Sequence, residues 1–141
     1  MEELKKYWTN LCGKYTVDTV LINEWFQVIL ASYCESHRHY HNIQHIASMI
    51  NEIEGQESDT RDKDSLLFST WFHDIVYDPK KKDNEAKSEQ IAQKALSQLN
   101  VPEDKINKVR QFILSTANHV INKADPNSDL SFFLDCDLKI L

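Results

Sequence analysis

Hydrophobic positions along the chain recur every three or four residues, which is the spacing of one face of a helix. One stripe runs from Asp18 to Tyr33, and a second runs from His41 to Ile53 and ends before Gly55. Capping residues, glycines and prolines mark where each helix should start and stop. Together with the apolar stripes, they predict helices over residues 1–13, 17–35, 41–54, 63–77, 84–99, 102–119 and 129–141.

The segment "SLLFSTWFHDIVY", residues 65–77, is apolar on nearly every side of a helix, so it is expected in the middle of a bundle. The chain has only 2 glycines and 3 prolines, which favours long helices over a sandwich or barrel. At 141 residues it is long enough for one hydrophobic core. The sequence therefore predicts a single all-α helical bundle over residues 1–141.

The net charge and the cysteine content limit which binding partners and which cellular compartment are expected for the protein. The formal net charge of −6 disfavours binding to a nucleic acid polymer, and Lys80–Lys82 is interpreted as a solvated loop. The chain shows neither the apolar core of a signal peptide nor a run long enough to span a membrane. Cys12, Cys34 and Cys136 are far apart and form no CxxC pair, which is typical of a reducing compartment. A cytoplasmic protein without a membrane partner is expected.

Four of the 6 histidines lie within "HRHYHNIQH", residues 37–45. His41 and His45 are four positions apart, so they would share one face of a helix, and His45 belongs to an inward-facing apolar stripe. His73 and Asp74 lie in the most apolar segment, where an ionised carboxylate is costly unless it is compensated. A divalent cation would compensate the carboxylate and accept imidazole as a neutral ligand.

Another pair of carboxylates lies in the apolar stretch "FLDCDLKIL". Asp135 and Asp137 are two positions apart, so on a helix they point in different directions, and one of them is expected to face the bundle interior. The spacing alone leaves open which one it is.

The ordered pieces "YHNIQH", "HD" and "DCDL" resemble the HD superfamily of metal-dependent phosphohydrolases. The first and last pieces are also similar to motifs of the class I cyclic-nucleotide phosphodiesterases. More closely, "HRHYHN", "WFHDIVYDP", "NEAKS" and "LDCDL" resemble a group of small predicted HD phosphohydrolases of unsettled substrate, over residues 37–141. A lone HD dipeptide means little, but four ordered pieces are a specific signal. The resemblance implies an HD-domain-like helical bundle.

The resemblance also implies roles for individual residues. It makes four residues the metal ligands: His45, His73, Asp74 and Asp137. Asp137 is preferred over Asp135 because "CDL" matches the motif. His41 falls on the histidine that protonates the leaving oxygen in the phosphodiesterases, so it is the expected catalytic residue.

The expected activity is that of a metal-dependent phosphohydrolase, either a phosphatase or a phosphodiesterase. Its substrate would be a small phosphorylated molecule, a phosphomonoester or a nucleotide, attacked by a metal-activated water. His41 would donate a proton to the departing oxygen. The mixed nitrogen and oxygen ligands suit Mn, Fe, Co, Ni or Zn, and they also admit Mg.

Other metal enzymes fit the sequence less well. His41 and His45 have the spacing of a zinc protease, but Asn42 stands where its general-base glutamate is needed. A di-iron carboxylate bundle requires Glu-x-x-His, which does not occur in this sequence.

A non-catalytic module that senses a nucleotide or a metal through a degraded HD site remains the alternative. Its support is that the resembling proteins continue beyond their last aspartate, whereas this chain stops at Leu141. Either the chain is truncated, or another segment or a second subunit of a homo-oligomer covers that end.

Several polar residues have no firm role at this point. His37 and His39 are interpreted as surface residues, with contact to a phosphate as the alternative. His119 would either line the pocket or act as a helix-end cation. Asn84 is expected to cap a helix, and Glu85 belongs to the "NE" piece without a derived role.

Overall fold

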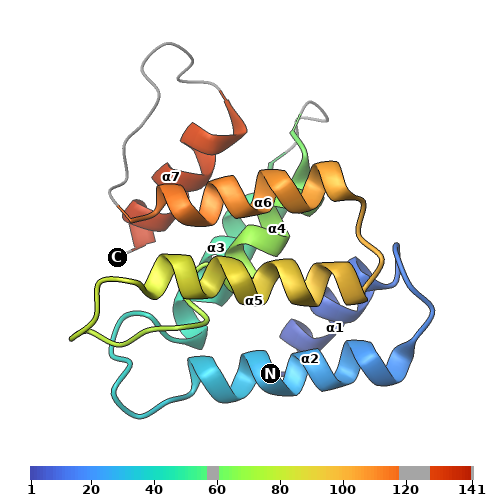
Figure 1. Ribbon diagram of the computed structural model, residues 1–141, viewed down its shortest axis with the longest axis horizontal. Helices are drawn as coiled ribbons and strands as arrows, with labels where there is room; N and C mark the ends of the chain where they lie inside the picture. Colours follow the sequence, from blue (N-terminus) through green and yellow to red (C-terminus); the bar gives the residue numbers. More distant parts are fainter. Residues whose placement is uncertain (57–60, 118–127, 141) are drawn as a thin grey trace.

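The computed structural model describes residues 1–56, 61–117 and 128–140, and this part of the chain is all-α (Figure 1). Its helices are α1 (Glu2–Cys12), α2 (Thr19–Tyr33), α3 (Ile43–Glu54), α4 (Lys63–Phe72), α5 (Asn84–Gln98), α6 (Glu103–Ser115) and α7 (Asp129–Ile140). The predicted all-α bundle is therefore confirmed. None of the described helices has the length and apolar character needed to cross a membrane.

Helix α4 lies in the middle of the bundle. Every residue from Ser65 to Phe72 is buried, as the apolar pattern on all sides of this segment predicts. α4 packs against α3, α5 and α6, and α7 in turn contacts α3 and α6. Figure 1 shows α5 and α6 running side by side in front of α4, with α2 along one edge of the bundle. The C-terminal end of α4 thus lies among segments that are distant in sequence.

The prediction that one helix spans residues 63–77 is wrong at its C-terminal end, because α4 stops at Phe72. The backbone N–H of Asp74 donates to the hydroxyl of Tyr33 at 3.1 Å instead of continuing the helical ladder. His73 and Asp74 therefore lie in the turn after the helix, where two adjacent side chains can be directed toward a common point.

The helix predicted to begin at His41 begins at Ile43 instead. Asn42 is its N-cap, and the side-chain oxygen accepts from the N–H groups of Gln44 at 3.0 Å and His45 at 3.3 Å. An asparagine side chain in this position satisfies donors that have no partner within the helix. His41 precedes the helix, so it does not share a helical face with His45.

Asn84 does not cap α5 as expected, because Asp83 occupies the N-cap position and Asn84 is the first helical residue. The side chain of Asn84 instead binds the backbone of Asp78, accepting from its N–H at 3.1 Å and donating to its carbonyl at 2.9 Å. Asn84 thereby closes the loop that contains the exposed Lys80–Lys82, which is solvated as predicted. Glu85 lies in the first turn of α5.

The start of α4 depends on Asp62, which leads to a testable expectation. Its carboxylate accepts from the N–H of Ser65 at 3.2 Å and from the ammonium groups of Lys105 and Lys108, both at 3.0 Å. Burial alone would raise the pKa of the Asp62 carboxyl, but these hydrogen bonds hold it well below its usual range. A carboxyl with a lowered folded-state pKa stabilises the fold above its unfolded-state pKa, and the benefit is lost as the pH falls.

Asp62→Ala should therefore lower the free energy of unfolding at pH 7 by about 1 kcal/mol or more, the typical cost of a lost N-cap. In urea titrations, the difference from wild type should shrink below about pH 4, near the unfolded-state pKa of aspartate. Asp62→Asn is the matched control, since asparagine still caps a helix but carries no charge. A difference that stays constant between pH 7 and pH 3 would contradict the contribution of the charge.

Candidate metal centre

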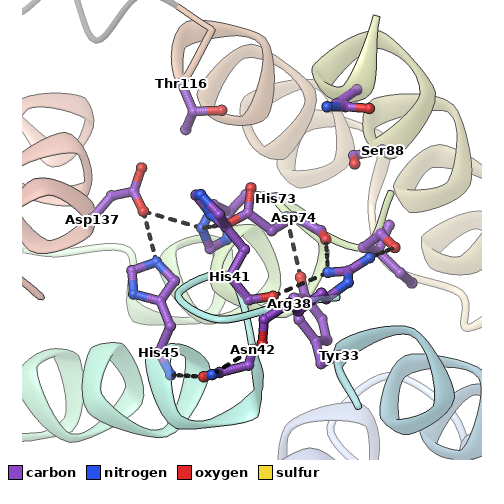
Figure 2. A network of polar contacts seen from close by, with 12 residues as sticks. Tyr33, Arg38, His41, Asn42, His45, His73, Asp74, Ser88, Thr116 and Asp137 are labelled. Carbon is purple, nitrogen blue, oxygen red and sulfur yellow. Dashed lines mark hydrogen bonds and ion pairs between the residues drawn. The ribbon is translucent and has the colours of Figure 1, made fainter. Parts of the chain in front are cut away.

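The four predicted ligand residues come together from three parts of the fold (Figure 2). His45 is on α3, His73 and Asp74 follow α4, and Asp137 is on α7. One nitrogen or oxygen atom from each side chain lies within 4.8 Å of those of the other three. Nε2 of His45 is 2.8 Å and Nε2 of His73 is 3.2 Å from the same Asp137 oxygen, Oδ1. His73 Nε2 is also 3.2 Å from Asp74 Oδ2.

The cluster is closed on one side and accessible on the other. The side chains of His45, His73 and Asp137 are only 2, 1 and 4% exposed. Asp74 is 18% exposed, and the neighbouring His41 is 26% exposed. Asp74 and His41 are therefore the side chains through which the cluster contacts solvent.

Hydrogen bonds orient the imidazoles of the cluster. Nδ1 of His73 lies 2.9 Å from the carbonyl oxygen of Thr70. Because a carbonyl can only accept, Nδ1 carries the proton and Nε2 is directed at the carboxylates, as in many histidines that bind metals. Nδ1 of His45 has no partner, and no other buried side-chain nitrogen or oxygen in the described part of the chain shares that condition.

The two carboxylates dominate the electrostatics of the cluster. Burial alone would lower the pKa of His73, but the charges of Asp74 and Asp137 outweigh it and raise this pKa well above its usual range. Burial alone would likewise raise the pKa of Asp74, but the charge of His73 and hydrogen bonds from His41 and His73 hold it well below its usual range. The cluster thus concentrates negative charge in a buried place and stabilises a positive partner there.

This donor set fits a metal ion. Two imidazole nitrogens and two carboxylates form a mixed set of the kind that divalent transition metals bind. The carboxylates compensate the charge of a cation, and a cation offsets the cost of burying them. The buried cluster of His45, His73, Asp74 and Asp137 can therefore hold a metal ion.

Two aspartates of α7, Asp135 and Asp137, differ in their exposure to solvent. Asp137 is buried with 3% of its surface exposed, whereas Asp135 is exposed to solvent. The start of α7 is fixed by Asp129, whose carboxylate accepts from Arg61 at 3.3 Å and from the N–H of Asp62 at 3.1 Å. Together with the packing of α7 on α3 and α6, this contact directs Asp137 toward the cluster.

His41 lies next to the cluster at its accessible edge. Nδ1 of His41 is 2.9 Å from Asp74 Oδ2, and its ring stacks on Tyr77 with centroids 4.3 Å apart. The resemblance assigns His41 only to the substrate, but here it also contacts the carboxylate of an expected metal ligand. Its part in catalysis stays a prediction.

Two residues at the site were not anticipated from the sequence. Arg38, within the histidine-rich segment, is buried, and its guanidinium donates to the carbonyl of Asp74. Tyr33 lies at the end of an apolar stripe, and its hydroxyl accepts a hydrogen bond from the N–H of Asp74. The one signal for Arg38 is its place among the histidines, because a sequence does not distinguish a buried arginine from a surface one.

The remaining polar candidates lie outside the cluster. His37 and His39 are exposed, and a ring nitrogen of His37 lies 3.0 Å from the carbonyl of Tyr77. Glu85 is not part of the four-residue cluster. His119 lies outside the described residues.

No protein-family model, curated protein or solved structure matches this chain. The fold and the site still define a class: an all-α protein with a buried centre of two histidines and two aspartates that can hold a metal ion. What this centre does is inferred from its geometry and from the order of its residues.

Proposed function

We propose that the protein is a metal-dependent phosphohydrolase of the HD type, a phosphatase or phosphodiesterase acting on a small phosphomonoester or nucleotide. The observation that carries the proposal is the convergence of His45, His73, Asp74 and Asp137. These residues also follow the order His … His-Asp … Asp that resembles this superfamily. His41, at the accessible edge, supplies a fifth functional group.

The cluster accounts for both binding and chemistry. His45, His73, Asp74 and Asp137 would hold a divalent cation such as Mn, Fe, Co, Ni, Zn or Mg. When bound, this ion would supply a Lewis acid that activates water and neutralises charge developing on the phosphate. Because two carboxylates by themselves repel a phosphate, the activity should depend strictly on the metal.

In this proposal, His41 donates the proton that the leaving group needs. Its Nδ1 donates to Asp74, which fixes the ring, so in the doubly protonated imidazolium form Nε2 would be the atom that delivers a proton and the neutral ring would keep its Nδ1–H. A group positioned in this way favours departure of an alkoxide or a nucleoside oxygen, both of which are poor leaving groups without protonation.

The first test is metal content. Purified protein should carry about one divalent ion per chain, matching the single cluster found in the described residues. Because a metal bound only by the folded state stabilises it, chelation should lower the melting temperature; at 100 times the dissociation constant the effect is about 2.7 kcal/mol. The site assignment fails if the protein retains no metal after reconstitution with Mn, Fe or Zn and its melting is unchanged by chelator.

A substrate panel then tests the activity. We expect hydrolysis of at least one class among aryl phosphomonoesters, aryl phosphodiesters and nucleotides, and loss of that activity with chelator. Protein that binds a metal but hydrolyses none of these compounds would contradict the proposed enzyme.

A further inference from the structure

Arg38 lies in the connection between α2 and α3, and its side chain is 0% exposed. Nη1 donates to the carbonyls of Asp74 at 2.5 Å and of His41 at 3.2 Å. Nη2 donates to the carbonyl of Ile75 at 2.8 Å, and Nε donates to Glu35 at 2.9 Å. One guanidinium thus joins the histidine-rich loop to the turn that carries an expected metal ligand (Figure 2).

The backbone of Asp74 is held at both of its polar groups. Arg38 binds its carbonyl, and the hydroxyl of Tyr33 accepts from its N–H at 3.1 Å. The same hydroxyl donates to the carbonyl of Trp71 at 2.9 Å, and the guanidinium lies over the Tyr33 ring at 5.1 Å. The last helical hydrogen bond runs from the N–H of His73 to the carbonyl of Ser69 at 2.9 Å, and beyond it these contacts fix where the Asp74 side chain begins.

The acceptors of Arg38 indicate what the residue does. A single nitrogen, Nη1, contacts the carbonyls of His41 and Asp74, whose side chains meet each other at 2.9 Å. Four of the five N–H groups of a guanidinium are accounted for by these contacts, which leaves little capacity for a phosphate. Arg38 also lines an adjacent pocket of about 620 Å³, but its donors point into the protein.

We infer that Arg38 is a positioning residue of the metal centre. By binding the backbone carbonyls of Asp74 and His41, it holds the Asp74 carboxylate in contact with the His41 imidazole. The inference rests on the proposed function in one respect, namely that Asp74 is a metal ligand. Residues that orient a metal ligand through hydrogen bonds typically contribute about 10–100-fold to metal affinity.

Arg38→Lys tests the inference. Lysine keeps the positive charge, but the donors of its ammonium all lie on one atom and cannot reach the three carbonyls that the spaced nitrogens of the guanidinium bind. The probe is Co²⁺ alone, titrated into apo protein and followed by its visible absorption spectrum. We expect affinity for Co²⁺ to fall about 10–100-fold. We also expect the spectrum of the saturated protein to change, since the spectrum reports the coordination of the ion. A merely structural loss of stability would lower the apo melting temperature without changing that spectrum.

Glu35→Gln is the matched control. It removes the ion pair of the same arginine, on a side chain that is 45% exposed, but leaves the contacts with the Asp74 and His41 carbonyls in place. This variant should bind Co²⁺ like wild type and with the same spectrum. If Arg38→Lys fails to fold, Arg38→Gln removes the buried charge together with the fork, and the same comparison applies.

The outcomes separate the two proposals. Wild-type affinity and an unchanged spectrum in the Arg38 variant overturn the positioning role and leave the proposed function standing. Equal losses in the Arg38 and Glu35 variants also overturn it, because the effect then follows the ion pair. Wild-type protein that does not bind Co²⁺ overturns the metal centre itself, and the role of Arg38 with it.

Discussion

Asp137→Asn is expected to abolish tight metal binding while the helical circular dichroism spectrum is retained. The Asp137 carboxylate is buried, and one of its oxygens lies 2.8 Å from His45 Nε2 and 3.2 Å from His73 Nε2. Asparagine keeps the size and the acceptor oxygen but removes the charge. A direct ligand should contribute more than the ~10–100-fold typical of residues that only orient ligands.

Asp135→Asn is the matched control for this experiment. Asp135 lies on the same helix, two residues away, but it is exposed and outside the cluster. Titration of both apo proteins with Mn²⁺ or Zn²⁺ should show a large loss of affinity for Asp137→Asn and little change for Asp135→Asn. The opposite order would mean that the inward face of α7 has been misassigned by two residues.

Much of the bundle could be predicted because its helices have apolar faces that are visible in the sequence. The segment 65–72 is buried on all sides, as its pattern indicates. The wrong boundaries at the start of α3 and at the end of α4 have different causes. Asn42 is a local N-cap, so the start at Ile43 could have been read from the sequence. The end at Phe72 could not, because the groups that bind the next backbone positions, on Tyr33 and Arg38, are more than thirty residues away.

The site was predictable to a similar extent. His45 faces inward because it belongs to an apolar stripe, and Asp74 is a candidate ligand because an uncompensated carboxylate is costly in an apolar segment. The choice between Asp135 and Asp137 needed the resemblance, since spacing alone cannot orient a helix whose packing partners are unknown. The contact between His41 and Asp74 depends on a loop conformation that no periodicity encodes.

Replacing His41 and His45 separately should give different results, although both are expected at the same centre. His45→Ala removes an expected ligand, so metal occupancy and activity should fall together. His41→Ala removes a contact to Asp74 Oδ2 at 2.9 Å, so metal affinity should weaken less, and saturating metal should restore occupancy. At saturation, the catalytic rate on substrates with poor leaving groups should still be about 10²–10⁴-fold lower, the usual contribution of a general acid.

The leaving group and a conservative variant distinguish proton transfer from positioning. On a substrate whose leaving group is p-nitrophenolate, which needs little protonation, the rate loss of His41→Ala should be much smaller than on substrates with poor leaving groups. In His41→Gln the side-chain amide can still donate to Asp74 but cannot deliver a proton, so its rates should resemble those of the alanine variant. Recovery of the rate in His41→Gln would instead assign His41 a positioning role. If His41→Ala cannot be loaded with metal at any concentration, His41 is itself a ligand; if it hydrolyses every substrate at the wild-type rate, His41 belongs to the scaffold.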